Sequence, residues 1–449
     1  MNRFIAAINR KWRSNVLSVV FNPKDERGRG RLCMLSSAIM ASIASNLSGG
    51  LFYTGFLLAY GFDITSIAFI TFIPTIASLL NMFSPWILEH FKRRKFILAG
   101  GKLLYYTINI GGVTLLPVLV TDHDALLVCF IAVVIAANAV NALFSSGYSA
   151  WQANFLPDNI RMSYFTATGC INSLFSYIII FLVSLLTDSL AGTPNQLSML
   201  ILIRWIAFGL GVLDCLINLI PKEYPYLSQA KVKISNIFVL PFRNHRFLFT
   251  ILIVAAYNFA ANLPNATINT YVLEIGISYS LVNGINALYF LFFIFFSKMW
   301  SKFVARHYWF RAFALAMLMQ AVTYYAYAFV TADTVWLYVV VRLTQHVFGV
   351  IMNSIVSSLP YVNLPEADRT NYLAFHTIVY TLASFTSMWA GTGFTKFMGT
   401  NVLTVFGFAF SSTQILLFAC AVAQCLVAIM SWCLSKPLTP PEARVQNAA

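Results

Sequence analysis

Four asparagines recur inside one long apolar run, in the stretch Asn258-Phe-Ala-Ala-Asn262-Leu-Pro-Asn265-Ala-Thr-Ile-Asn269. Their spacing of four, three and four residues places them on one helix face, because successive helical residues turn by about 100°. An unpaired amide in hydrocarbon costs several kcal/mol, so such a face cannot contact lipid. The stretch therefore predicts a helix that turns its asparagines toward other helices or a water-filled cavity. Pro264 predicts a kink in this helix, either as a hinge or as a packing feature.

The chain as a whole is apolar enough to be an integral membrane protein. Of its 449 residues, 59% are hydrophobic and 10% are charged, and the mean hydropathy is +0.74. A soluble domain carries about 25% charged residues. The net charge of +14 would suit a nucleic-acid partner, but the charges lie in short segments between apolar spans. The positive-inside rule explains this distribution better, so we expect no nucleic-acid partner.

Twelve apolar segments of membrane-spanning length follow a basic arm at residues 1–32. The predicted helices lie at 33–60, 66–88, 96–120, 125–150, 164–187, 197–220, 247–272, 279–300, 309–331, 335–359, 371–397 and 413–435. The expected fold class is therefore an all-α polytopic membrane protein. We expect an N-terminal half at 33–220, a central loop at 221–246, a C-terminal half at 247–435 and a tail at 436–449.

Loop charges predict the orientation of the spans. Lysine and arginine gather in the N-terminal arm, the central loop and the other connections expected on the same side, whereas the opposite connections carry acidic residues such as Asp63, Asp122, Glu274 and Asp333. By the positive-inside rule both termini are cytoplasmic. We expect a multi-pass protein of the plasma (cytoplasmic) membrane.

The two predicted halves repeat each other. The loop Pro157-x3-Arg161-x2-Tyr164 recurs 208 residues later as Pro365-x3-Arg369-x2-Tyr372. In the first helix of each half, four positions match at an offset of 216: Ser42 with Asn258, Asn46 with Asn262, Gly49 with Asn265, and Tyr53 with Asn269. Parallel repeats of six spans are a transporter architecture.

On these features the chain resembles the major facilitator superfamily of secondary transporters over nearly its whole length. The family's basic motif between the second and third spans matches the segment Pro85-Trp-Ile-Leu-Glu89-His90-Phe-Lys92-Arg93-Arg94-Lys95, in which both glycines of the motif are replaced. The resemblance implies a gating role for Glu89, Arg93 and Arg94.

The loop arginines Arg161 and Arg369 occupy equivalent predicted cytoplasmic positions in the two halves. This equivalence predicts matching contacts when the inner side closes. The alternative is that both arginines only fix the topology.

The resemblance also implies that the first, fourth, seventh and tenth spans line a central cavity, with the second, fifth, eighth and eleventh beside them. Polar residues at helical spacing fall on these spans. The candidate substrate-binding residues are Asn46, Tyr53, Asn138, Asn141, Asn172, Asn258, Asn262, Asn265, Asn269, Arg342, His346, Asn353, His376 and Tyr380. For any single position the alternative is hydrogen bonding between helices, which small polar residues commonly provide in membranes.

Few charged residues lie within the spans. Lys102 is placed to snorkel toward the cytoplasm, and Arg204 either snorkels outward or pairs with a neighbour. Asp214 is the one acid well inside a span, on a helix expected to be peripheral. Arg342 shares a face with His346, and an intramembrane ion is a functional hypothesis by default.

The leading hypothesis is a transporter that works by alternating access around a midplane site. Asparagines offer donors and acceptors together, which suits a neutral polyhydroxylated solute such as a sugar or glycoside. The alternatives are an organic anion held by Arg342, and a receptor that binds without transport. No catalytic motif, metal-type cysteine spacing or phosphate-binding loop occurs, so we expect no enzyme, cofactor or metal. The expected partners are a small-molecule substrate and the lipid bilayer, a coupling ion is left open, and a monomer is expected.

Overall fold

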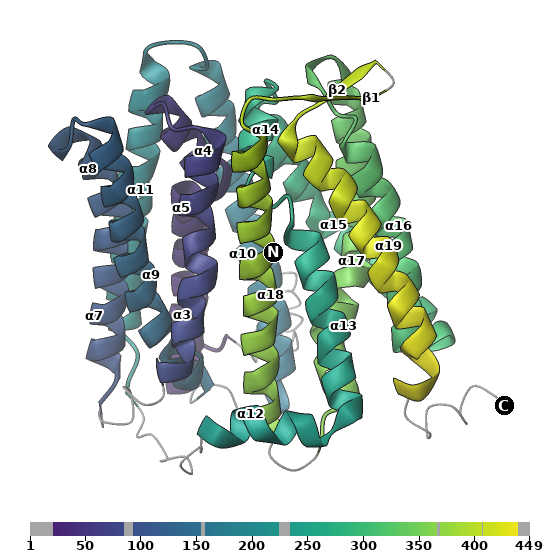
Figure 1. The fold of residues 1–449 in the computed structure, drawn as a ribbon. Coiled ribbons are helices and arrows are strands. Elements are labelled where there is room, and N and C mark those ends of the chain that lie inside the picture. Colours follow the sequence, from purple (N-terminus) through teal and green to yellow (C-terminus); the bar gives the residue numbers. More distant parts are fainter. Residues whose placement is uncertain are drawn as a thin grey trace, which may run out of the picture. The chain divides into compact units, whose positions relative to one another are not determined.

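The computed structural model describes residues 21–84, 93–153, 158–223, 234–365, 369–405 and 407–438, and almost all of them are helical (Figure 1). The helices before the central loop are α3 Glu26–Ser48, α4 Gly50–Ala59, α5 Ile64–Ala77, the 3-10 helix η1 Ser78–Phe83, α7 Lys95–Tyr106, the π-helix η2 Thr107–Gly112, α8 Val113–Leu119, α9 His123–Ala153, α10 Asp158–Ser189 and α11 Asn195–Asn218.

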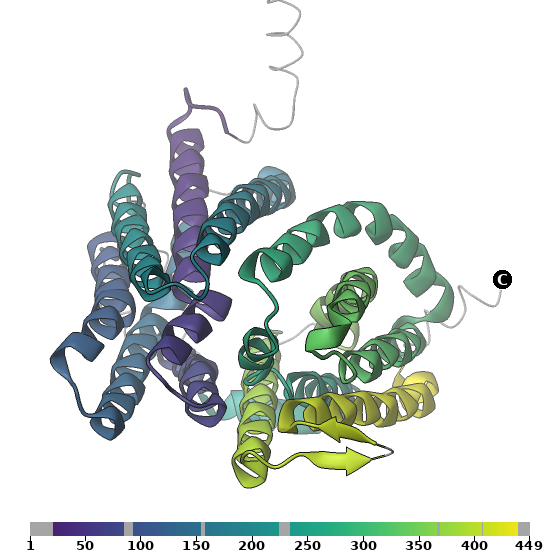
Figure 2. The same ribbon diagram turned by 90° about the horizontal axis from the view of Figure 1, so that it is seen from above.

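After the central loop come α12 Ile234–Arg243, α13 His245–Asn262, α14 Ile268–Glu274, α15 Tyr279–His307, α16 Trp309–Tyr327, the 3-10 helix η3 Ala332–Thr334, α17 Val335–Val362, α18 Arg369–Met398 and α19 Ser412–Leu438. A hairpin of β1 Leu403–Val405 and β2 Phe408–Phe410 pairs antiparallel before α19. Seen from above, the hairpin lies beside α19 (Figure 2). The Phe410 ring contacts those of Phe329 and Phe418, which fixes the hairpin on α16 and α19.

The helices form two compact units. The N-terminal unit contains the described residues up to Phe56 and those from Leu80 to 223, and the C-terminal unit contains Leu57–Leu79 and the described residues from 234 onward. Helix α5 packs on α18, where Phe72 lies 5.6 Å from Phe385 between ring centroids. The contacts therefore group the predicted second span with the C-terminal unit.

Nine helices in the described part of the chain are long and apolar enough to cross a membrane, or ten if α12 and α13 count as one bent span. The chain is a multi-pass membrane protein. Helices α16 and α18 occupy the predicted ninth and eleventh spans and reach the necessary length, but they are not among the nine. The predicted number of twelve spans is thus not confirmed.

The first predicted helix and the predicted central loop differ from the structure. Helix α3 begins at Glu26 rather than at residue 33, because Asp25 caps it by accepting the backbone N–H groups of Arg27 and Gly28. This cap makes the polar run before the first apolar span helical. The predicted central loop at 221–246 contains α12, a ten-residue helix.

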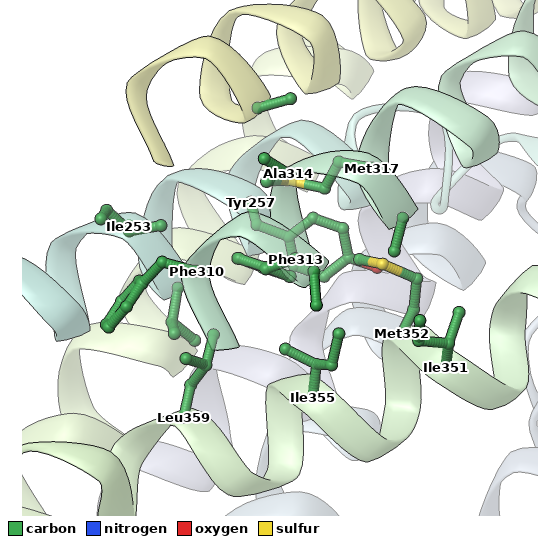
Figure 3. Close-up of a cluster of buried hydrophobic side chains, with 14 of the residues drawn as sticks. Ile253, Tyr257, Phe310, Phe313, Ala314, Met317, Ile351, Met352, Ile355 and Leu359 are labelled. Carbon is green, nitrogen blue, oxygen red and sulfur yellow. The ribbon is translucent and has the colours of Figure 1, made fainter. Parts of the chain in front are cut away.

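An apolar core stabilises the C-terminal unit. Figure 3 shows buried side chains of α13, α16 and α17 meeting around Tyr257 and Phe313, whose ring centroids lie 5.3 Å apart. Ile253 and Tyr257 on α13 point into this core. The neighbouring face of α13, which carries Asn258, is thereby directed toward α18.

Candidate functional site

The asparagine stretch is divided between two helices. Helix α13 ends at Asn262, residues 263–267 form turns, and α14 starts at Ile268. Pro264 has no N–H to donate to the carbonyl of Ala260, and the helix ends here. The prediction of a disturbance at Pro264 is confirmed, but the helix is broken rather than kinked. The expectation of one continuous helix face is therefore wrong: Asn265 lies in the break and Asn269 on α14.

A ladder of amides joins α13 to α18, and the two helices lie side by side (Figure 1). Asn258, which is 2% exposed, donates to the carbonyl of Tyr380 at 2.7 Å and to the hydroxyl of Ser384 at 2.5 Å. Asn262 donates to the Asn258 Oδ1 at 2.8 Å, and Asn265 donates to the Asn262 Oδ1 at 3.1 Å. Asn265 is exposed, so the ladder leads from a buried anchor to an accessible amide.

Helix α18 also holds the break itself. The hydroxyl of Ser387 donates to the carbonyl of Phe259, in the last turn of α13. Gly391 lies so close that a Cβ on it would be 2.1 Å from the carbonyl oxygen of Leu263. A side chain of the neighbouring helix thus pairs with one backbone carbonyl beside the break, the kind of contact that an irregular segment in a membrane needs.

The first helix of the N-terminal unit is broken at the matching position of the repeat. Helix α3 ends at Ser48 and α4 starts at Gly50, whose φ of +51° is in the left-handed region that favours glycine. Nearby, Ser176 on α10 donates to Ser42 on α3 at 3.0 Å. Asn46 is exposed, and its side chain donates to the carbonyl of Ser42.

Arg204 is a buried cation beside this second break, and it is 2% exposed. Its guanidinium donates to Thr114 Oγ1 at 2.8 Å and to the carbonyls of Ser48 at 3.2 Å and Asn109 at 3.1 Å. Its Cζ also lies 5.0 Å from the Tyr53 ring centroid. Arg204 does not snorkel. It pairs with neighbouring segments, which is the second of the two expectations, through uncharged oxygens; no acid pairs with it in the part of the chain that the structure describes.

A second charged group in the N-terminal unit is an ion pair. Asp214, fully buried on α11, accepts from Lys102 Nζ at 2.5 Å, Ser37 Oγ at 2.5 Å and Tyr106 OH at 2.8 Å. Gly211 allows this approach, because a Cβ there would lie 2.7 Å from the Tyr106 ring. Lys102 is thus paired rather than snorkelling, and Asp214 links α3, α7 and α11.

Arg342 and His346 on α17 face α15 in the C-terminal unit. Arg342 donates to Asn286 Oδ1 at 2.9 Å and to Gln345 Oε1 at 2.8 Å. His346 is 7% exposed, and its Nε2 lies 2.9 Å from the carbonyl of Ile285. This contact requires the Nε2–H form of the imidazole, since a carbonyl only accepts. The sequence did not single out Asn286 or Gln345, although Gln345 adjoins His346.

The other candidate binding residues are not brought together with the ladder. Asn138 is buried and donates to the carbonyl of Val134 in its own helix. Asn141 and Asn353 are exposed, and the side chain of Asn172 is half-buried beside Ser176. The His376 ring lies beside that of Tyr380, tilted by 41° with ring centroids 5.7 Å apart, and its Nε2 is buried with no hydrogen-bond partner in the described residues.

The predicted gating residues are only partly visible. Glu89 lies outside the described residues, and the side chains of Arg161 and Arg369 do as well. Arg93 is exposed. The backbone N–H of Arg94 donates to Glu223 Oε1 at 2.5 Å, so Glu223 caps the start of α7.

Two acids at chain positions outside the predicted spans have shifted pKa values. Burial raises the pKa of Asp63, but hydrogen bonds from Ser66 and Thr65 outweigh it and the net shift is downward. Burial, and then the charge of Asp63, raise the pKa of Glu274. The two carboxylates therefore repel each other at the ends of α5 and α14.

Solved transporter structures share the fold of this chain. The POT family transporter PepTSo matches with a TM-score of 0.67 at 12% identity, covering 91% of this chain and 98% of that one. The chain has the major facilitator fold. The xylose transporter XylE from E. coli matches with a TM-score of 0.61 at 13% identity, covering 89% and 94%.

The nucleoside transporter NupG also shares the major facilitator fold with this chain. It matches with a TM-score of 0.58 at 16% identity, and the match covers 91% of this chain and 99% of that one. No protein-family model matches the sequence, and no curated protein matches it in sequence. The predicted fold class is confirmed. At sequence identities this low, the structural matches establish the fold alone.

Proposed function

We propose that the chain is a secondary transporter that moves a small polar solute across a membrane by alternating access. The fold is that of solved nucleoside, xylose and peptide transporters. Discontinuous helices commonly form the substrate sites of such proteins, and this chain breaks the first helix of each repeat at matching positions. In this proposal the protein lies in the plasma membrane with both termini in the cytoplasm, acts without a cofactor, and is not an enzyme.

We propose a neutral polyhydroxylated solute, such as a sugar or glycoside, as the substrate. The observation that carries this choice is the amide ladder from buried Asn258 through Asn262 to exposed Asn265. Each amide donates inward, so the last one presents its carbonyl oxygen at the accessible end. That oxygen accepts a hydroxyl hydrogen, and it carries no charge that would demand an ionic partner.

Uptake into liposomes tests this function. The full chain is reconstituted and screened with radiolabelled sugars, nucleosides and carboxylates in a counterflow assay. We expect Asn265→Ala to raise the half-saturating concentration of a transported sugar about tenfold, the equivalent of one hydrogen bond of roughly 1.4 kcal/mol. Asn195→Ala, which changes an exposed asparagine at the start of α11, is the control. Binding of the sugar without flux would instead indicate a receptor.

An organic anion is the second candidate substrate. It is favoured by hydrogen-bond donors at and beside Arg342 that have no acceptor in the described residues. The Nε of Arg342 and the Nε2 of Gln345 are buried and have no hydrogen-bond partner in the described residues. No carboxylate pairs with Arg342 in that part of the chain either. Arg342 is half-buried, and a partly desolvated cation without a counterion is costly, so a bound carboxylate would stabilise it.

The two candidates differ in what they predict for Arg342→Gln. For an anionic substrate, this change should abolish carboxylate counterflow, because the charge that offsets the carboxylate is lost. For a neutral substrate, sugar counterflow should persist, with its rate changed by only a few fold. Methyl esters of the transported carboxylates separate charge recognition from shape.

A further inference from the structure

Helix α12 crosses the end of α13 rather than continuing it. The axes of α12 and α13 are bent by 109°. Asn244 stands between them and caps α13, because its Oδ1 accepts the backbone N–H of Phe247 at 3.1 Å. Figure 1 shows α12 lying across the ends of α13 and α18. A helix set at this angle to a membrane-spanning helix runs roughly along the plane of the membrane.

One face of α12 packs on the C-terminal unit. Ile237 is 7% exposed and belongs to a cluster with Phe247, Tyr372 and Phe375. The hydroxyl of Tyr372 donates to the carbonyl of Leu240 at 3.2 Å. Helix α12 is thus fixed in place by α13 and α18.

The opposite face of α12 is apolar and exposed. Phe238, Val239 and Phe242 are 43%, 50% and 59% exposed, and the edge of this face touches α18 where the Phe242 ring lies 5.9 Å from that of Phe375. At 100° per residue they cover an arc of about 100° on the side away from Ile237. In the first turns of α13, which follows α12 directly, the apolar residues Phe249 and Leu252 are also exposed, at 45% and 46%. Since a membrane-spanning helix turns such residues to lipid, the same lipid reaches α12.

Positive charge borders this apolar face. Arg243 and Arg246 are both exposed. In the described chain no acid pairs with Arg243 or Arg246. A helix that combines large apolar side chains with adjacent basic ones fits the boundary between acyl chains and anionic headgroups.

We propose that α12 lies in the membrane interface and binds acidic phospholipids. Phe238, Val239 and Phe242 insert beside the acyl chains, and Arg243 and Arg246 bind the headgroup phosphates. The partner is the bilayer itself, because the exposed face of α12 is continuous with the lipid-facing side of α13. This inference rests on the geometry of α12 and does not depend on the substrate.

Photocrosslinking tests what covers the exposed face. Benzoylphenylalanine replaces the exposed Phe238 in one full-length protein and the buried Ile237 in another, and both are reconstituted in vesicles of phosphatidylcholine and phosphatidylglycerol. We expect phospholipid adducts from position 238 and adducts within the chain from position 237. A crosslink from position 238 to another protein, or only to the chain itself, would overturn the proposal.

The headgroup preference tests the two arginines. Phosphatidylglycerol is titrated into the full chain in detergent, with phosphatidylcholine in parallel, and the thermal-unfolding midpoint is followed. The double variant Arg243→Gln, Arg246→Gln should need about thirtyfold more phosphatidylglycerol for the same shift, at roughly 1 kcal/mol per basic residue. Lys298→Gln with Lys302→Gln, exposed residues of α15, is the charge-matched control. An equal response in both double variants, or no preference for phosphatidylglycerol in the wild type, would overturn the assignment.

Discussion

A Cβ atom on Gly391 would lie 2.1 Å from the carbonyl oxygen of Leu263, so α18 packs directly against the backbone of the break after α13 at this pair. Only a hydrogen fits between them. We expect Gly391→Ala to lower the thermal-unfolding midpoint, because overpacking against backbone costs about 1–3 kcal/mol. It should also reduce counterflow, since the break must shift to accommodate the methyl group.

Gly393→Ala is the matched control for this prediction, because a Cβ on Gly393 meets nothing within 4 Å. Both changes add one methyl group to the same helix. Equal stability of the two variants would show that α18 does not hold the break in place.

We expect Ser384, although small, to contribute strongly to the stability of the contact between α13 and α18. Its hydroxyl receives hydrogen bonds from both Asn258 and Asn262, so Ser384→Ala leaves two amides without this acceptor. We expect a loss of about 1–3 kcal/mol in the free energy of unfolding. Denaturation of the purified protein in detergent measures this. Thr386→Ala removes an exposed hydroxyl that bonds to its own helix, and we expect almost no change from it.

The buried pair Lys102–Asp214 should behave as a coupled unit. Lys102→Met leaves a fully buried carboxylate without its cation, which costs about 3–5 kcal/mol. Removing both charges in Lys102→Met with Asp214→Leu should recover part of that loss. Thermal unfolding of both single variants and the double variant gives the coupling energy. Additive losses would mean that the pair contributes no specific interaction.

Glu274 gives a pH prediction with a definite sign. Its pKa is raised in the folded protein by burial and by the charge of Asp63. Folding therefore favours the protonated form of Glu274. The stability that this form contributes is complete below the pKa of the unfolded chain and is lost as pH rises through the folded pKa. We expect Glu274→Gln to raise the unfolding midpoint at neutral pH and to leave it unchanged in acid.

Asp63 predicts a pH dependence of stability with the opposite sign and serves as the control for Glu274. Its net pKa shift is downward, so its stabilising contribution is present above the unfolded pKa and disappears as pH falls through the folded pKa. Asp63→Asn should therefore lower the midpoint at neutral pH. A higher midpoint for Asp63→Asn at neutral pH would mean that repulsion by Glu274 outweighs the hydrogen bonds from Ser66 and Thr65.

The fold could be predicted from the sequence because long apolar segments and their loop charges report membrane spans directly. Local cues also placed the disturbance at Pro264 correctly. The short helix α12 was missed because it lies in a basic segment that reads as a loop. The broken helix after Asn262 was underestimated because periodicity assumes that a helix continues.

The charged contacts could not be predicted for a different reason. Arg204 bonds to carbonyls of Ser48 and Asn109, and side-chain patterns carry no information about free carbonyls. Lys102 and Asp214 lie on different helices, and their contact depends on packing rather than on spacing. The repeat gave no hint either, since Asp214 corresponds at an offset of 216 to Met430, which packs against the apolar core of the C-terminal unit.

The hydrogen bond between His346 and Ile285 bears on proton coupling. The Nε2–H of His346 is donated to a carbonyl and the Arg342 cation lies one turn away, so a protonated imidazole would place a second positive charge beside the first. We therefore expect His346→Gln to change the substrate affinity but not the pH dependence of transport if the substrate is neutral. If the substrate is an anion bound by Arg342, its charge would permit His346 to protonate with it, and the same change should remove the pH dependence. Substrate-induced proton movement into liposomes, with wild type and His346→Gln side by side, decides between the two outcomes. Proton symport of a neutral sugar that survives His346→Gln would contradict both outcomes and direct attention to His376, whose Nε2 is buried without a hydrogen-bond partner in the described residues.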